Sequence, residues 1–100
     1  MPEAFHRLET PPSSFADLKK AVVARRVIFP RLVESVAKKV IEHPELMAFD
    51  SAPSIARACG VSTSTVMRFI THIGFRDVAK ARGIFREELR RRMDDKRAAG

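Results

Sequence analysis

The sequence contains no tryptophan, no tyrosine and only one cysteine, Cys59. A single cysteine excludes a disulfide bond within the chain, which fits a reducing compartment. No apolar run approaches the roughly 18 residues that a membrane-spanning helix needs, so we expect no membrane partner. Residues 1–14 also lack the basic start and the apolar stretch of a secretion signal. These absences predict a cytoplasmic protein.

The composition is typical of a globular domain, because 45% of the 100 residues are hydrophobic and 31% are charged. Lysine and arginine number 19 against 12 aspartates and glutamates, which gives a formal net charge of +7. The excess lies in the second half, since residues 51–100 hold 11 basic and 5 acidic side chains, a net charge of +6. A polyanion is therefore expected to bind that half, if it binds the chain at all.

Hydrophobic residues recur at helical spacing, and no alternating run bounded by turns predicts a strand. We expect an all-α fold, a bundle of five helices with no β-wing. The first helix should begin at Ser13 or Ser14 and end near Arg26, and the others should cover residues 30–43, 51–59, 62–73 and 77–93. Residues 45–50 are expected to form a short connection. Along the chain, the sequence predicts a flexible leader over residues 1–13, one domain over 14–93, and a linker or tail over 94–100.

Several residue types mark the ends of these helices. Serine and aspartate favour helix starts because their side-chain oxygens accept bonds from free backbone N–H groups. The expected caps are Ser14, Ser51, Ser62 and Asp77. Glycine favours helix ends because it adopts a positive φ at little cost, and Gly60 and Gly74 are so placed. The residues expected in the core include Val36, Val40, Ile55, Val66 and Phe69.

The segment 55–69 has the spacing of two helices joined by a sharp turn. Ala56 offers a small surface where the helices approach, and Gly60 can adopt the positive φ that the turn requires. Val61 fills the inside of the turn, and Val66 packs the second helix against the first. This arrangement is typical of a helix-turn-helix.

The polar side of the second helix is then expected to face away from the core. Small hydroxyl residues let a helix start enter a major groove, where hydroxyl and N–H groups bond phosphate oxygens. Arg68 can reach either a guanine edge or a phosphate, and both alternatives stay open. The predicted DNA-binding residues are Ser62, Thr63, Ser64, Thr65, Met67, Arg68, Thr71 and His72. Similar hairpins also occur as plain structural units, but the basic second half favours DNA binding.

Two stretches, VAKKVIEHPELMAFDS and SIARACGVSTSTVMRFITHIGF, carry a more specific pattern. Its parts are His43-Pro44, Ser51, Ala56, Gly60-Val61-Ser62, Val66-Met67-Arg68-Phe69 and Gly74-Phe75. From Phe15 to about Leu89 the chain thereby resembles the N-terminal DNA-binding domain of the RpiR/MurR family of bacterial transcriptional regulators. Each part alone is a weak signal, and the joint match is specific.

The resemblance implies a helical domain that binds double-stranded DNA as a homodimer and regulates a sugar or amino-sugar operon. Two positions depart from the family pattern: Phe29 stands where Ser or Thr usually precedes a proline, and Ser54 stands where Glu usually completes a capping box. Family members continue into a sugar-isomerase-like domain that senses phosphorylated sugars. We therefore expect a phosphosugar effector only if such a domain follows Gly100.

Other functions are less favoured by the sequence. No metal or other cofactor is expected, since the three histidines are far apart and no cysteine pair lies near them. No enzymatic activity is expected either, because the neighbouring carboxylates Glu87-Glu88 and Asp94-Asp95 point apart on a helix and no glycine-rich phosphate loop is present.

The alternative to DNA binding is a protein-interaction module that binds a partner regulator through its last helix. The arginines at 90–92 either contact DNA or form a solvated helix end, and the acidic residues around them favour the latter.

Overall fold

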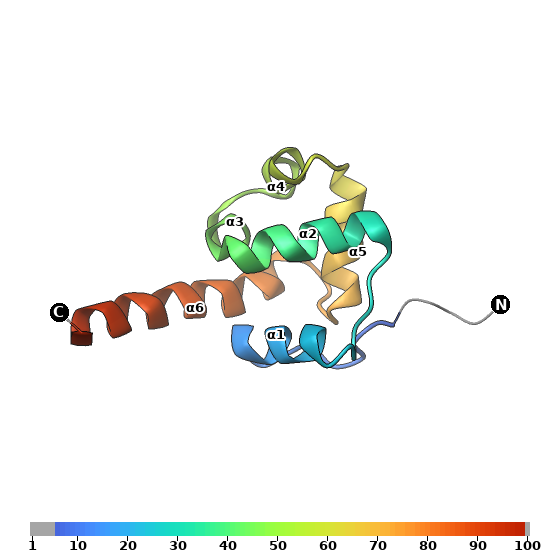
Figure 1. The fold of residues 1–100 in the computed structure, drawn as a ribbon. Coiled ribbons are helices and arrows are strands. Elements are labelled where there is room, and N and C mark those ends of the chain that lie inside the picture. Colours follow the sequence, from blue (N-terminus) through green and yellow to red (C-terminus); the bar gives the residue numbers. More distant parts are fainter. Residues whose placement is uncertain (1–5, 100) are drawn as a thin grey trace.

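A computed structural model describes residues 6–99, and this part of the chain is helical (Figure 1). The helices are α1 (Phe15–Val23), α2 (Arg31–Glu42), α3 (Pro44–Phe49), α4 (Ala52–Cys59), α5 (Thr63–His72) and α6 (Val78–Ala99). The described residues include no β-strand, and their one β-type pairing is an isolated antiparallel bridge between His6 and Ile28. The all-α prediction is therefore confirmed. None of the described helices combines the length and the apolar character needed to cross a membrane.

The expected number of five helices is wrong, because residues 44–49 form the additional helix α3. The sequence pattern predicts a helix that ends at residue 43 and only a short connection over residues 45–50. Proline also fits the first position of a helix, where its missing N–H has no partner to lose. At the other end of α3, α6 supplies partners for the free carbonyls. Arg82 donates to the carbonyl of Met47 at 3.0 Å, and Arg86 donates to that of Ala48 at 2.8 Å.

The predicted caps are present at four helix starts. In each, a side-chain oxygen accepts a bond from the backbone N–H three residues further on, which satisfies a donor that the helix itself leaves free. The pairs are Ser14 with Asp17 at 3.0 Å, Ser51 with Ser54 at 3.3 Å, Ser62 with Thr65 at 3.2 Å, and Asp77 with Lys80 at 2.9 Å.

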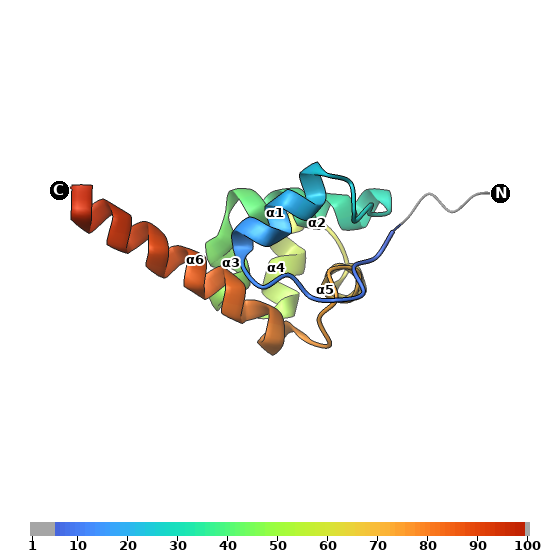
Figure 2. The ribbon, with the colours of Figure 1, turned by 90° about the horizontal axis from the view of Figure 1, so that it is seen from below.

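All six helices contribute buried residues to the core, and the most extensive contacts join α3 with α6, α2 with α5 and α4 with α5 (Figures 1 and 2). The five residues predicted to be buried have no exposed surface: Val36, Val40, Ile55, Val66 and Phe69. Phe85 of α6 is equally buried and packs edge-on against Phe15 of α1, with ring centroids 5.5 Å apart. The apolar stripe of α2 faces α3, α4 and α5, whereas α6 is held mainly by α3.

The segment 6–12 runs along the body of the protein rather than away from it. His6 and Ile28 exchange two backbone hydrogen bonds of 3.0 and 2.9 Å, and the N–H of Leu8 donates to the carbonyl of His72 at 2.8 Å. Pro11 lies so close to Gly74 that a Cβ on Gly74 would be 2.9 Å from the Pro11 nitrogen. Within the expected leader over residues 1–13, residues 1–5 lie outside the described residues, and the part from His6 onward makes these contacts.

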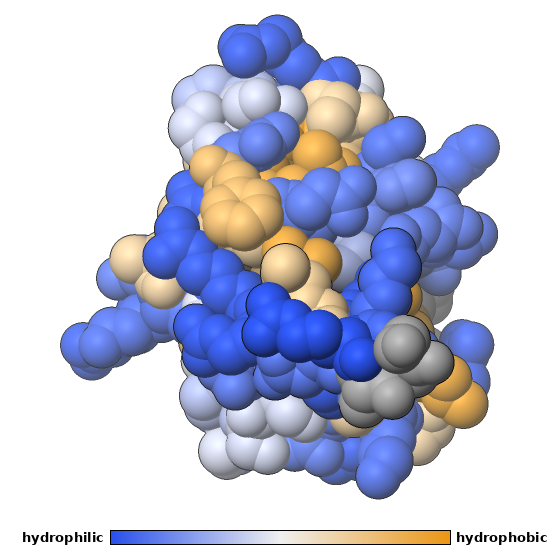
Figure 3. Space-filling view, turned by 90° about the vertical axis from the view of Figure 1, so that its left-hand side faces the viewer, coloured by the Kyte–Doolittle hydropathy of each residue, from blue (hydrophilic) through white to orange (hydrophobic). Residues whose placement is uncertain are grey.

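Helix α6 extends well past its expected end at Met93 and projects from the body (Figures 1 and 2). The face from which it projects is mainly hydrophilic, with hydrophobic patches between the charged side chains (Figure 3). Phe49 at the end of α3 is 66% exposed, and the guanidinium of Arg86 lies 5.9 Å from its ring centre. This end of the molecule therefore combines charge with isolated apolar groups.

Candidate nucleic-acid interface

The turn between α4 and α5 has the geometry that the sequence predicts. Gly60 adopts a φ of 69°, in the left-handed region. Its N–H donates to the carbonyl of Arg57 at 3.2 Å, and the N–H of Val61 donates to that of Ala56 at 3.0 Å. This pair of bonds satisfies the last carbonyls of α4 and turns the chain sharply. Helix α4 is seen nearly end-on in Figure 1 and α5 nearly end-on in Figure 2, so the two helices cross steeply.

Helix α5 has one buried and one exposed side. Its buried side includes Val66, Phe69 and Ile70, which have no exposed surface, and the helix packs mainly against α2 and α4. Its exposed side carries residues spaced by three and four positions, which places them in one stripe along the helix. These residues are Ser64, Met67, Arg68 and Thr71, and Thr63 and the cap Ser62 are also exposed.

Thr65 does not face outward as the sequence analysis expected. Its side chain is 5% exposed, and its Oγ1 lies 3.0 Å from the Oγ of Ser62. The reason is its position, because Thr65 precedes Phe69 by one helical turn and so lies at the edge of the buried side. Thr65 is adjacent in sequence to other hydroxyl residues, but the helix turns its side chain toward the core. We therefore assign Thr65 to the capping of α5 and not to contact with a ligand.

The last turn of α5 is held by local bonds. The hydroxyl of Thr71 donates to the carbonyl of Met67 at 3.1 Å, and Nδ1 of His72 lies 3.0 Å from the carbonyl of Arg68. The ring of His72 is half-buried and lies 6.0 Å from the ring of Phe29. Thr71 therefore belongs to the exposed stripe, whereas His72 lies at its edge and also contacts the body of the protein.

Arg68 differs from Arg90, Arg91 and Arg92 of α6 in having no acidic partner among the ion pairs of the described residues. The arginines of the run 90–92 are all paired with glutamates one turn earlier. The pairs are Arg90 with Glu87 at 3.1 Å, Arg91 with Glu88 at 2.8 Å, and Arg92 with Glu88 at 2.7 Å. The bonds from Arg91 hold the pKa of the Glu88 carboxyl below its ordinary value, although burial acts in the opposite direction. The positive charge at 90–92 is thus largely neutralised, and that of Arg68 is not.

Two further basic residues lie near the end of α5, outside the set predicted from the sequence. Arg7 and Arg76 line the same surface depression as Thr71, with a volume of about 610 Å³. Arg7 reaches this place because the bond from Leu8 to His72 fixes the N-terminal segment there. That contact joins distant parts of the chain, and no local sequence pattern indicates it.

Comparison of this chain with models of protein families, with curated proteins and with solved structures finds no match. Within the described residues, no three histidine, cysteine or acidic side chains come close enough together to hold a metal ion. The exposed surface of α5 carries the hydroxyl groups of Ser64 and Thr71 together with Met67 and Arg68.

Proposed function

We propose that this protein is a sequence-specific DNA-binding regulator of transcription, similar to the RpiR/MurR family, and that α5 enters the major groove. The observation that carries the proposal is the exposed stripe of α5, in which Arg68 lies among Ser64, Met67 and Thr71 along the helix and takes part in no ion pair of the described residues. The stripe lies on a helix that Gly60 and the core hold at a steep angle to α4. Regulation of a sugar or amino-sugar operon in the cytoplasm is part of the same proposal.

The contacts divide into two kinds. Ser62, Thr63 and Ser64 lie at the start of α5, where free N–H groups and the helix dipole favour phosphate oxygens. Arg68 lies one turn deeper, where it can bond the O6 and N7 atoms of a guanine or a second phosphate. Arg7 and Arg76, beside the far end of α5, add positive charge for the phosphate backbone, which Glu9 in the same depression partly offsets.

The proposal also includes a homodimer, because a lone helix of this kind buries little surface on DNA and two half-sites double it. Helix α6 is the candidate for part of the dimer interface, since it projects beyond the body (Figure 1). Analytical ultracentrifugation with and without DNA tests this part. A monomer under both conditions would contradict it and leave the DNA contacts of α5 to be tested separately.

The central experiment starts with the enrichment of binding sites from a random pool of DNA duplexes. Affinity for the enriched site and for a scrambled duplex is then measured by fluorescence anisotropy over a range of salt concentrations. The wild-type protein should bind with an affinity that falls steeply with salt, because bound phosphates release counterions. Arg68→Ala should cost about 1–3 kcal/mol on the enriched site and relax the preference at one base pair, if Arg68 contacts a guanine.

The matched control is Arg26→Ala, which removes the same charge from an exposed position between α1 and α2, outside both α5 and α6. If Arg68 instead holds a phosphate, its substitution should leave the base preference intact and make the salt slope shallower by about 1 per subunit. Unchanged affinity and slope for Arg68→Ala, or equal effects of both variants, would show that α5 is not the reading helix.

The second candidate is a module that binds a protein partner through its helical surface. The exposed apolar side chains of Phe49 on α3 and Met93 on α6, 66% and 62% exposed, favour it. Such an interface would depend little on salt, in contrast to DNA binding. A failure to enrich any duplex, combined with salt-independent binding to a protein partner, would replace the DNA proposal by this one.

A further inference from the structure

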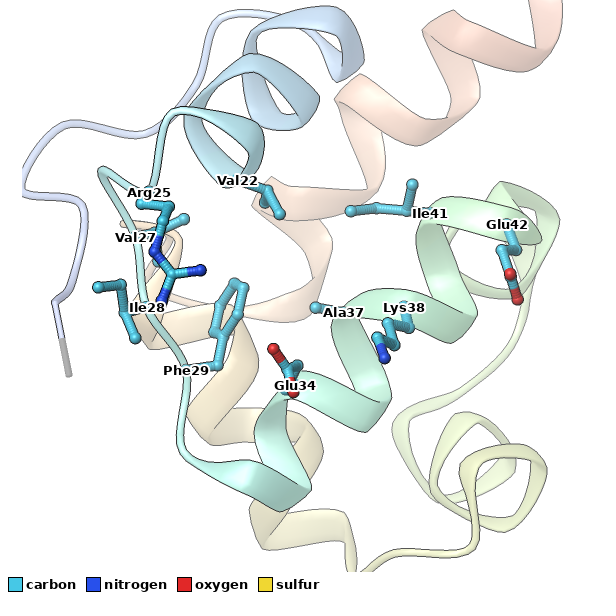
Figure 4. A pocket seen from close by; sticks show the side chains of 10 residues that line it. All are labelled: Val22, Arg25, Val27, Ile28, Phe29, Glu34, Ala37, Lys38, Ile41 and Glu42. Carbon is cyan, nitrogen blue, oxygen red and sulfur yellow. The ribbon is translucent and has the colours of Figure 1, made fainter. Parts of the chain in front are cut away.

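A pocket of about 460 Å³ lies on the side of the molecule formed by α1, α2 and the segment that joins them (Figure 4). Its wall is mainly apolar, with Val22 from α1, Phe29 from the joining segment and Ile41 from α2. Its rim carries the charged side chains of Arg25, Glu34, Lys38 and Glu42. Pockets that bind small molecules have volumes of this order and combine apolar walls with a few polar groups.

Arg25 holds its place at the rim in an unfavourable backbone conformation. Its φ is 60°, and it is the one residue other than glycine with a positive φ in the described part of the chain. The bonds around it repeat those at Gly60, because the N–H of Arg25 donates to Val22 at 3.1 Å and that of Arg26 donates to Ala21 at 2.9 Å. A glycine would form the same turn without strain. Strain of this kind persists at functional sites, where the side chain has a task.

The rim charges are two positive and two negative, and they are not paired with one another. None of the ion pairs in the described residues involves Arg25, Glu34 or Lys38. Near Arg25 and Phe29, a ligand with only a carboxylate would meet the carboxylate of Glu34, and a ligand with only an amine would meet the guanidinium of Arg25. A ligand that carries both charges matches the rim, and an apolar body matches the wall.

We propose that this pocket binds a free amino acid with a large apolar side chain. Arg25 binds its carboxylate, Glu34 binds its ammonium group, and the side chain lies against Phe29 and Ile41. Charge-assisted hydrogen bonds of this kind are stronger than neutral ones, and the guanidinium fits a carboxylate with two parallel bonds. The site is separate from the exposed stripe of α5.

Phe29 connects the pocket to α5. Its ring lines the pocket and also lies 5.8 Å from the ring of Phe69 and 6.0 Å from the ring of His72, both on α5. An occupant of the pocket therefore contacts a side chain that packs directly on α5. This part of the inference rests on the proposed function, since it makes the amino acid an effector of DNA binding.

The test of binding is isothermal titration calorimetry without DNA, with three compounds that share one aromatic body. Phenylalanine carries both charges, 3-phenylpropionate lacks the ammonium group, and 2-phenylethylamine lacks the carboxylate. Phenylalanine should bind with a Kd of about 1 mM or tighter, and each analogue roughly tenfold more weakly. Equal binding of either analogue, or no binding of phenylalanine, would overturn the proposal.

Two variants test the proposed contacts of Arg25 with the carboxylate and of Glu34 with the ammonium group. Arg25→Gly and Glu34→Gln should each weaken phenylalanine binding by about tenfold. Arg26→Ala is the matched control, because Arg26 is the next residue, carries the same charge and does not line the pocket. Arg25→Gly should fold at least as well as the wild type, since glycine relieves the positive φ, so a melting curve separates lost binding from lost structure. Full binding by Arg25→Gly would contradict the role given to Arg25.

The effect of phenylalanine on the affinity of the protein for DNA is measured separately, with the enriched duplex. Phenylalanine should change the DNA affinity of the wild type and leave that of Arg25→Gly unchanged, and by linkage the duplex should change the phenylalanine affinity by the same factor. An unchanged DNA affinity in the presence of bound phenylalanine would overturn the coupling. If the chain binds no duplex at all, calorimetry still decides whether the pocket binds the amino acid.

Discussion

The turn after α4 and the turn after α1 share one backbone geometry and differ in the residue that adopts it. Gly60 has a φ of 69° and Arg25 a φ of 60°, and in both turns the same pattern of two backbone bonds closes the helix. At Gly60 no atom lies within 4 Å of an added Cβ, so glycine is there for its backbone and not for lack of space. At Arg25 the chain tolerates an unfavourable conformation and gains a guanidinium at the rim of a pocket. The comparison teaches that the two turns serve different purposes. The turn at Gly60 fixes the angle between α4 and α5, and the turn at Arg25 places a charged side chain at the rim of the pocket.

The largest effect on the free energy of unfolding is expected at the contact between Phe29, which lines the pocket, and Phe69 of α5. Phe69→Ala should lower the free energy of unfolding by about 3–5 kcal/mol, because it removes a fully buried ring and leaves a cavity. Urea denaturation followed by circular dichroism measures it. A loss below about 1 kcal/mol would mean that α5 does not pack on the core as described.

A third turn of the same kind, at Gly74, combines backbone strain with a lack of space. Its φ is 90°, and an added Cβ would lie 2.9 Å from the backbone nitrogen of Pro11. Gly74→Ala should therefore cost about 2–4 kcal/mol, from the positive φ together with overpacking. The same denaturation measurement on a variant that lacks residues 1–12 is the control, because without Pro11 only the cost of the backbone conformation should remain.

Gly60→Ala isolates the cost of the backbone conformation alone, since the added methyl group has free space around it. It should lower the free energy of unfolding by about 1–2 kcal/mol, the usual cost of a left-handed conformation for a residue with a Cβ. A melting temperature equal to that of the wild type would remove the main support for the steep turn between α4 and α5.

The smallest expected effect on the free energy of unfolding is an increase, in contrast to the decreases expected for the other variants. Arg25→Gly should raise the free energy of unfolding by about 0.5–1 kcal/mol, because glycine relieves the strain while the turn and its bonds remain. Arg26→Gly serves as the control, since the described residues with positive φ do not include Arg26. If Arg25→Gly destabilises the protein, the Arg25 side chain makes contacts that outweigh the strain, and the comparison with Gly60 would not hold.

The sequence predicts those features of the fold that depend on residues close to one another along the chain. Ser14, Ser51, Ser62 and Asp77 act as caps because each needs only the N–H group three residues away. The core side of α5 followed from the helical spacing of apolar residues. The exposed positions of Ser64, Met67, Arg68 and Thr71 followed from the same spacing.

Other features were missed because local signals are ambiguous or absent. Pro44 ends one helix and starts another, and the short α3 depends on bonds from Arg82 and Arg86 of the distant α6. Thr65 was misplaced because its polarity was given more weight than its position on the helix. Arginine is not a turn residue by type, so nothing in the sequence indicates the positive φ of Arg25.

The contact between the segment from Leu8 to Pro12 and the end of α5 has a consequence for how the chain folds. Leu8 bonds to His72 and Pro11 lies against Gly74, so most of the chain separates the partners. During synthesis on the ribosome, this segment emerges early and has to wait until α5 has been made and has emerged. Closing so long a loop is slower than forming the helices, which need only local contacts. We expect the segment to be attached last, once α1, α2 and α5 have assembled.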